Sequence, residues 1–199
     1  MQFISHRINT LEQLEATPDH FGVEIDIRSY GSDLVLHHDP FERGELFDEW
    51  LKAFHHKTLI LNVKEEGLEP HLIQRMADIG CEDYFFLDQS FPFLVRYAKA
   101  ARGRSAVRFS EFESLDTVLA LAGKVDWVWV DCFTKLPFKD DDYDRLKAAG
   151  FNLCLVSPEL QGRDADAAIA DMGAQILSLN LQPDAICTKR ADLWERVIG

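Results

Sequence analysis

Strand and helix patterns alternate along the whole of this 199-residue sequence, and that alternation restricts the possible folds more than any other feature. Short apolar runs rich in β-branched residues are each followed by a segment whose apolar residues recur three or four positions apart, which is the helical period. Strands that alternate with helices form a parallel sheet with helices packed on its faces. A chain of this length is long enough for one domain with a substantial core, so residues 1–199 are expected to form a single domain.

Eight strand–helix units are expected. The strands are predicted at residues 3–6, 23–28, 59–64, 84–88, 106–109, 126–131, 152–157 and 185–188. The helices that follow them are predicted at residues 10–17, 45–54, 70–79, 92–101, 115–122, 140–149, 164–172 and 192–198. The number and order favour an α/β fold, a compact (β/α)8 TIM barrel, over the alternative of an open doubly wound sheet.

Two segments do not fit the simple repeat. The strand-like residues 34–38 follow residues 23–28 after a gap too short for a parallel crossover, so the two runs are predicted to form an antiparallel β-hairpin after strand 2. Residues 175–181 are ambiguous, because they could form a strand that competes with residues 185–188 for the last position in the sheet.

Composition excludes several classes of partner. The net charge of −13 argues against nucleic acid and anionic membranes, both of which need a basic surface. No apolar run reaches the ~20 residues of a membrane span, and the sequence begins directly with a strand rather than a signal peptide. The four cysteines include no CxxC pair, and Cys132, Cys154 and Cys187 lie in apolar runs that indicate buried reduced thiols. We expect a cytoplasmic protein with a small-molecule partner; the oligomeric state is not indicated.

Glu24 and Asp26 are the most informative pair of residues. Positions i and i+2 of a strand point to the same face, so the two carboxylates lie side by side between the apolar residues Val23, Ile25 and Ile27. Like charges repel and burial is costly, and a divalent cation would resolve both problems. Oxygen ligands favour Mg²⁺ or Ca²⁺, with Mn²⁺ also admitted, and no His/Cys cluster has zinc spacing.

Other polar residues also follow predicted strands, where the functional groups of a barrel gather. His6, Arg7 and Lys64 lie at such ends, and His38 ends the second arm of the hairpin. Two imidazoles can act as general acid and general base, while Arg7 and Lys64 can bind phosphate oxygens. Together with a metal ion, this set suits phosphoryl chemistry.

The sequence resembles the glycerophosphodiester phosphodiesterases, within the phospholipase C-like phosphodiesterase superfamily. The resemblance covers the chain thinly and rests on segments in the order of that family: Ser5-His6-Arg7, Gly22-Val23-Glu24-Ile25-Asp26-Ile27-Arg28, Leu34-Val35-Leu36-His37-His38-Asp39-Pro40, Leu61-Asn62-Val63-Lys64 and Asp184-Ala185-Ile186-Cys187-Thr188. It implies a barrel that hydrolyses phosphodiesters with a divalent cation. By position, His6 and His38 match the acid–base pair, Glu24 and Asp26 match metal ligands, and Arg7 and Lys64 match phosphate-binding residues.

Asn62 departs from the family pattern, which has a glutamate there. Its carbonyl oxygen can still bind a metal, but one negative charge is lost and the metal affinity should fall. Asp131, Glu66 and Glu159 are candidates for the missing carboxylate. The alternative function is therefore a catalytically weakened barrel that binds a phosphorylated sugar or polyol without turnover.

Other histidines are interpreted as structural or solvated. His37 alternates to the face opposite His38 and is not expected to be catalytic. His55 and His56 lie in a polar loop and are expected to be exposed. A phosphate-binding barrel isomerase is a poorer interpretation, because a glycine-rich loop near the last two strands is lacking and Gly162 alone does not provide one.

Overall fold

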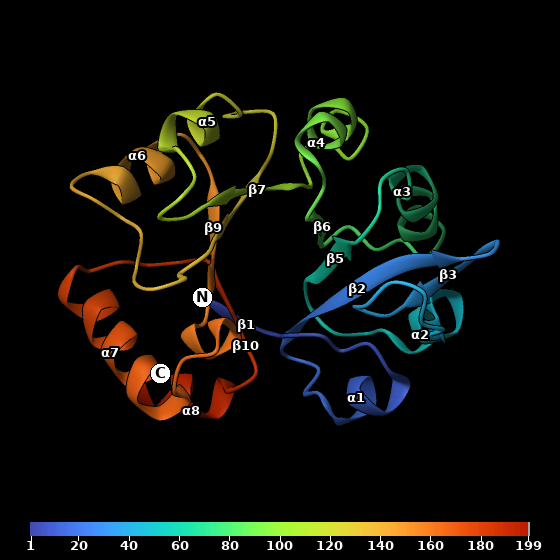
Figure 1. Cartoon of the computed structure of the whole chain (residues 1–199), viewed down its shortest axis with the longest axis horizontal. Helices are drawn as coiled ribbons and strands as arrows, with labels where there is room; N and C mark the ends of the chain where they lie inside the picture. Colours follow the sequence, from blue (N-terminus) through green and yellow to red (C-terminus); the bar gives the residue numbers. More distant parts are fainter. Residues whose placement is uncertain (199) are drawn as a thin grey trace. The chain divides into compact units, whose positions relative to one another are not determined.

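The computed structural model describes residues 1–198 and has a mixed α/β fold in which strands and helices alternate as predicted (Figure 1). The chain divides into two compact units. The N-terminal unit comprises Ser5–Ser105, and the C-terminal unit comprises Met1–Ile4 with Ala106–Gly199.

The N-terminal unit is built on three parallel strands. β2 pairs in parallel with β5, and β5 pairs in parallel with β6. The antiparallel strands β3 and β4 extend the sheet beyond β2, which confirms the predicted hairpin. The elements are α1 (Leu11–Ala16), β2 (Gly22–Tyr30), β3 (Asp33–Leu36), β4 (Glu45–Leu46), α2 (Phe47–Ala53), β5 (Leu59–Val63), α3 (Glu69–Asp78), β6 (Tyr84–Leu87) and α4 (Phe91–Tyr97).

The C-terminal unit continues the same repeat. β7, β8, β9 and β10 pair in parallel in chain order, and the first residues of β1 (Gln2–Ser5) lie beside β10, where the Gln2 amide donates to the Asp184 carbonyl. The elements are β7 (Ala106–Phe109), α5 (Leu115–Leu119), β8 (Trp127–Val130), α6 (Asp142–Ala148), β9 (Asn152–Val156), the 3-10 helix η1 (Pro158–Gln161), α7 (Ala165–Ser178), β10 (Ala185–Thr188) and α8 (Ala191–Ile198).

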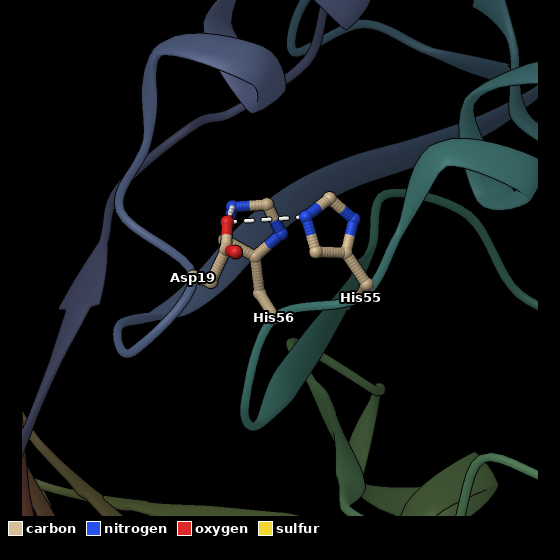
Figure 2. A group of neighbouring side chains, drawn as sticks. All are labelled: Asp19, His55 and His56. Atoms are coloured by element: carbon tan, nitrogen blue, oxygen red, sulfur yellow. Dashed lines mark hydrogen bonds and ion pairs between the residues drawn. The ribbon is translucent and has the colours of Figure 1, made fainter.

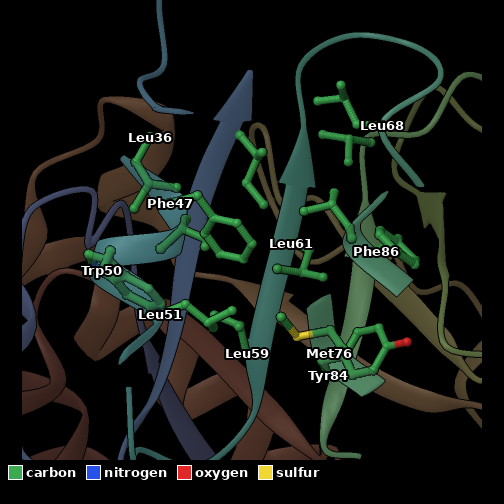
Figure 3. Packing of buried hydrophobic residues seen from close by; sticks show 14 of the residues in the cluster. Leu36, Phe47, Trp50, Leu51, Leu59, Leu61, Leu68, Met76, Tyr84 and Phe86 are labelled. Carbon is green, nitrogen blue, oxygen red and sulfur yellow. The ribbon is translucent and has the colours of Figure 1, made fainter. Parts of the chain in front are cut away.

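One face of β2 carries apolar side chains and the other carries carboxylates, and the carboxylate face holds the candidate site. Val23, Ile25 and Ile27 belong to the hydrophobic core of the N-terminal unit, where α2 and α3 cover the sheet (Figure 3). Glu24 and Asp26 therefore project from the opposite face. The same alternation holds on β5, whose Leu59, Leu61 and Val63 join the core. Figure 3 labels ten side chains of this core: Leu36, Phe47, Trp50, Leu51, Leu59, Leu61, Leu68, Met76, Tyr84 and Phe86.

Most element boundaries shift by a few residues from those predicted, and two assignments change. Residues 45–46, predicted as the start of a helix, form the short strand β4 against β3. The strand alternative for residues 175–181 is wrong, because α7 runs to Ser178. Its buried residues recur at helical spacing on one face, namely Ala168, Ile169, Met172, Gly173 and Ile176.

Eight strand–helix repeats are present in the described part of the chain once the hairpin strands β3 and β4 are set aside. Cys132, Cys154 and Cys187 are buried and unbridged, as predicted. Within residues 1–198, none of the helices is both long enough and apolar enough to span a membrane.

Candidate active site

The carboxylates of Glu24 and Asp26 lie at the centre of the candidate site. Both side chains are completely buried on β2. The parallel register of β2 and β5 places Asp26 opposite Asn62, so the two strands present three oxygen-bearing side chains on one face of the sheet. The sequence correctly predicted that the carboxylates share a face and are removed from water.

Glu24 is held by two hydrogen bonds. The Asn62 side-chain amide donates to Glu24 Oε1 at 2.7 Å, and the backbone N–H of Arg7 donates to Oε2 at 2.8 Å. Burial, and then the neighbouring charge of Asp26, raise the pKa of Glu24 from its ordinary value of 4.5 to about 7, although both hydrogen bonds and the Lys64 charge act in the opposite direction. Glu24 is therefore able to carry or release a proton near neutral pH in the metal-free protein.

Asp26 is surrounded by donors and cations. Asn9 Nδ2 donates to Asp26 Oδ2 at 2.9 Å, and Asn9 Oδ1 accepts the backbone N–H of Asp26 at 2.8 Å. The Arg7 guanidinium Nε lies 3.6 Å from Oδ2, and Lys64 Nζ lies 3.1 Å from Oδ1. Two cationic side chains thus offset the charge of one buried carboxylate.

Asn62 presents an unpartnered acceptor. While its amide nitrogen donates to Glu24, its Oδ1 is buried and accepts no hydrogen bond in the part of the chain that the structure describes. A buried carbonyl oxygen without a donor is costly, and a metal ion can supply the missing interaction. The donor set of Glu24, Asp26 and Asn62 Oδ1 consists only of oxygens and so fits a Mg²⁺ or Ca²⁺ ion.

His6 and Arg7 follow β1 on the same side as the carboxylates. His6 Nε2 lies 3.8 Å from Glu24 Oε2, and its side chain is 15% exposed. Arg7 has φ = 57°, a left-handed conformation that is uncommon for residues other than glycine. This backbone geometry accompanies the hydrogen bond from the Arg7 amide to Glu24, so the strained residue is tied directly to the site.

His38 lies in the loop after β3 and is more exposed than the other site residues. Its side chain is 40% exposed, and its Nδ1 lies 2.8 Å from Asp39 Oδ1. That hydrogen bond lowers the pKa of Asp39. The contact of the His38 imidazole is thus with Asp39, whereas its backbone is tied to the site through Arg28.

Arg28 also contacts the candidate site, and no role was predicted for it. Its Nε and Nη2 donate to the His38 carbonyl at 3.1 and 3.0 Å, and its Nη1 donates to the Lys64 carbonyl at 3.4 Å. One guanidinium therefore joins the loop after β3 to the end of β5. The signal in the sequence was its position on β2, two residues after Asp26 and hence on the same face.

Asn9 and Asp88 were also missed. Thr10 caps α1 and leaves the Asn9 side chain to bind Asp26. Asp88 follows β6, adopts φ = 62°, and accepts from Lys64 Nζ at 3.1 Å. It places a carboxylate beside Lys64.

A polar pocket of about 330 Å³ opens beside Lys64, at the ends of β5 and β6. It is lined by the segments 63–66 and 88–90 together with the fully buried Glu69. Gln89 Oε1 and Ser90 Oγ are buried there without hydrogen-bond partners among residues 1–198. Such unsatisfied groups are suited to a ligand that carries hydroxyl groups.

Similarity to solved structures extends over nearly the whole chain. A glycerophosphodiester phosphodiesterase from Agrobacterium tumefaciens str. C58 matches with a TM-score of 0.71 at 15% identity, over 99% of this chain and 98% of that chain. A glycerophosphoryl diester phosphodiesterase from Parabacteroides distasonis ATCC 8503 matches with a TM-score of 0.68 at 15% identity, over 99% of this chain and 85% of that chain. The resemblance inferred from the sequence is thus confirmed at the level of the fold. No family model and no curated protein matches the sequence.

Proposed function

We propose that this chain is a metal-dependent phosphodiesterase that hydrolyses a small phosphodiester by histidine acid–base catalysis on a closed (β/α)8 barrel. The observation that carries the proposal is the buried pair Glu24 and Asp26, flanked by an imidazole and two cationic side chains. The similarity in fold to glycerophosphodiester phosphodiesterases supports it. Because a fold hosts many reactions, the proposed activity rests on the residues of the site.

His38 is the proposed general base. Because the Asp39 carboxylate accepts from Nδ1, it favours the tautomer that leaves the Nε2 lone pair free to take a proton. That proton comes from a substrate hydroxyl that attacks phosphorus, which gives a cyclic phosphate that water then opens.

His6 is the proposed general acid. Its Nε2 lies 3.8 Å from Glu24 Oε2, which places an imidazole beside the buried carboxylates, where it can protonate the leaving oxygen. Lys64 and Arg7 are the proposed residues that bind the phosphoryl oxygens, since both carry a positive charge beside the Asp26 carboxylate.

Glu24, Asp26 and Asn62 are the proposed ligands of the divalent cation. When bound, the ion supplies Lewis-acid stabilisation of the charge that develops on the phosphoryl oxygens. The protein residues nevertheless hold the site together without it, because Lys64 and Arg7 already offset the charge of Asp26. We expect weaker metal binding than a site with a third carboxylate would give.

The pocket beside Lys64 is the proposed site for an alcohol group of the substrate. Its unsatisfied acceptors and buried Glu69 favour a small hydroxylated group over an acyl chain. A glycerophosphodiester-like substrate fits this description.

The test is hydrolysis of a chromogenic phosphodiester that carries a free hydroxyl next to the ester, the 4-nitrophenyl ester of glycerol 3-phosphate, with and without Mg²⁺, Ca²⁺ or Mn²⁺. The wild type is compared with His38→Ala and with the control His71→Ala, which removes an exposed histidine from α3. We expect metal-dependent turnover that falls about 10²- to 10⁴-fold in His38→Ala and is unchanged in the control. Equal rates for both variants, or turnover independent of metal, would contradict the proposal. Binding of a phosphorylated polyol without turnover would favour the alternative of a weakened barrel.

A further inference from the structure

We propose that Asp19, His55 and His56 form a second metal site, which binds zinc and ties together two loops of the N-terminal unit. Asp19 lies in the loop that leads into β2, and the two histidines lie just before β5. The site is therefore at the amino ends of these strands, whereas Lys64 and the Arg28 contacts lie at their carboxyl ends. It does not depend on the proposed function.

The three side chains converge closely enough for one ion. One ligand atom from each lies within 4.8 Å of the others. Asp19 Oδ1 is 3.1 Å from His55 Nε2 and 3.9 Å from His56 Nε2. Zinc bonds of about 2.0–2.2 Å in a tetrahedron hold neighbouring ligand atoms about 3.4 Å apart, which is close to the 3.1 Å between Asp19 Oδ1 and His55 Nε2. Figure 2 shows the two imidazole rings side by side, with the carboxylate facing them and a ring nitrogen of His56 turned toward His55.

Backbone carbonyls set the tautomers of both histidines. A carbonyl only accepts, so the contact of His55 Nδ1 with the Ala53 carbonyl at 2.7 Å requires an N–H on Nδ1. In the neutral ring, the His55 Nε2 lone pair then faces the Asp19 carboxylate oxygen. Two electron-rich atoms 3.1 Å apart require a cation between them, either a proton or a metal ion.

His56 distinguishes these two possibilities. It was expected to be exposed, but its side chain is only 1% exposed, so that expectation was wrong. Its Nε2 donates to the Thr17 carbonyl at 2.9 Å, which leaves the lone pair on Nδ1. Nδ1 is buried without a hydrogen-bond partner in the described chain. A proton on His55 satisfies only the Asp19 contact, whereas a metal ion also satisfies this buried nitrogen.

The pattern of contacts is that of a metal site. Ligating histidines commonly donate their second N–H to a backbone carbonyl, as both rings do here. Two imidazoles and one carboxylate suit zinc, in contrast to the all-oxygen set around Glu24. Asp19 and His55 are exposed, so an ion reaches the site from solvent and keeps water as its fourth ligand. At the amino-terminal ends of barrel strands, such a site contributes stability rather than catalysis.

The test is a calorimetric titration of the metal-free protein with Zn²⁺ in excess Mg²⁺, which fills oxygen-ligand sites, combined with thermal unfolding. Asp19→Asn and His55→Gln remove one exposed ligand each, and His71→Gln is the matched control. We expect zinc affinity to fall at least about 100-fold in both ligand variants, since even outer contacts of metal ligands are worth 10- to 100-fold. Zinc should raise the unfolding temperature of the wild type and the control but not of the ligand variants.

A second measurement separates the metal from the proton. Co²⁺ in place of Zn²⁺ should give visible absorption of a four-coordinate ion in the wild type and in His71→Gln, and lose it in His55→Gln. Equal Zn²⁺ affinity in all four proteins, or no zinc binding by a folded wild type, would overturn the proposal. The contact would then be an ion pair between Asp19 and a protonated His55.

Discussion

Asn62 shows how one residue changes the electrostatics of a buried site. In place of a third carboxylate, it donates a hydrogen bond to Glu24 and leaves its own oxygen unsatisfied. The exchange lowers the repulsion among acids when no metal is bound, and it reduces the charge that attracts a cation. At the proposed metal site, Asn62 would therefore stabilise the metal-free state and weaken the binding of the ion.

Asn62→Glu should tighten Mg²⁺ or Ca²⁺ binding by about tenfold or more, because ligand charge sets the affinity of oxygen sites for these ions. Isothermal titration calorimetry measures the change. Asn62→Leu, which has similar volume and no oxygen, should weaken binding. Wild-type affinity in both variants would place the Asn62 side chain outside the metal site.

Glu24 should make the stability of the metal-free protein depend on pH. The folded chain keeps the Glu24 proton up to about pH 7, while the unfolded chain releases it near the ordinary value of 4.5. Between these values the folded state binds more protons, so the free energy of unfolding falls as pH rises, by about 3 kcal/mol at most. The contribution of Glu24 to the free energy of unfolding is fully present below the pKa that Glu24 has in the unfolded chain, and it is lost above about pH 7.

Denaturant unfolding at several pH values in the presence of a chelator measures this dependence. Glu24→Gln, which removes the titrating group and keeps the shape, should flatten the curve between about pH 5 and pH 7. The same slope in both proteins would show that Glu24 does not titrate in this range.

At the scale of elements, the site depends on how the hairpin arm is held against the parallel strands. β3 continues into the loop that carries His38, and Arg28 fixes the carbonyl of that loop and the carbonyl of Lys64 at the end of β5. A residue of β2 thus positions the loop that carries His38. Sequence patterns predicted the hairpin from its short turn, whereas the guanidinium contacts depend on three-dimensional placement and could not be predicted.

Arg28→Lys should lower kcat of the proposed reaction about 10²-fold, because a small misplacement of a catalytic group has an effect of that size. Lysine keeps the charge and loses the planar fork that reaches two carbonyls. KM should change little if Arg28 acts only by positioning His38. Arg75→Lys is the control, since Arg75 makes a similar two-point contact with Asp48 on the surface. A wild-type kcat in Arg28→Lys would exclude the positioning role.

The packing of α7 on α8 gives a prediction for the C-terminal unit. A Cβ added at Gly173 would lie 2.1 Å from Val197 Cγ1, and this crowding should destabilise the fold by about 1–3 kcal/mol in Gly173→Ala. Thermal unfolding measures the loss. The double variant Gly173→Ala with Val197→Ala should recover part of it, and additive effects of the two changes would show that the contact is not the cause.

At the scale of the whole molecule, the charge of −13 acts on any anionic substrate before it reaches the site. Long-range repulsion slows the encounter at low ionic strength and is screened by salt. For an anionic phosphodiester, kcat/KM should therefore rise severalfold between low salt and about 0.15 M, where the Debye length is about 8 Å. A zwitterionic phosphocholine ester should show little change. A fall in kcat/KM with salt would mean that local cations such as Lys64 dominate the encounter.

The order of elements was predictable because periodicity is a local property, and each predicted strand is present, most of them with boundaries shifted by one or two residues. The paired carboxylates were predictable because strand alternation places residues 24 and 26 on one face. Three other features could not be predicted, because they depend on contacts between residues distant in sequence. These are the pairing of Asp26 with Asn9, the contacts of Arg28 and the burial of His56. The ambiguous residues 175–181 were decided by burial along α7 rather than by propensity.

The division of the chain has a consequence for how such proteins diversify. Every side chain placed in the candidate active site comes from Ser5–Ser105, a single contiguous stretch of the gene. Recombination that exchanged the codons for residues 106–199 would leave all of these side chains encoded together.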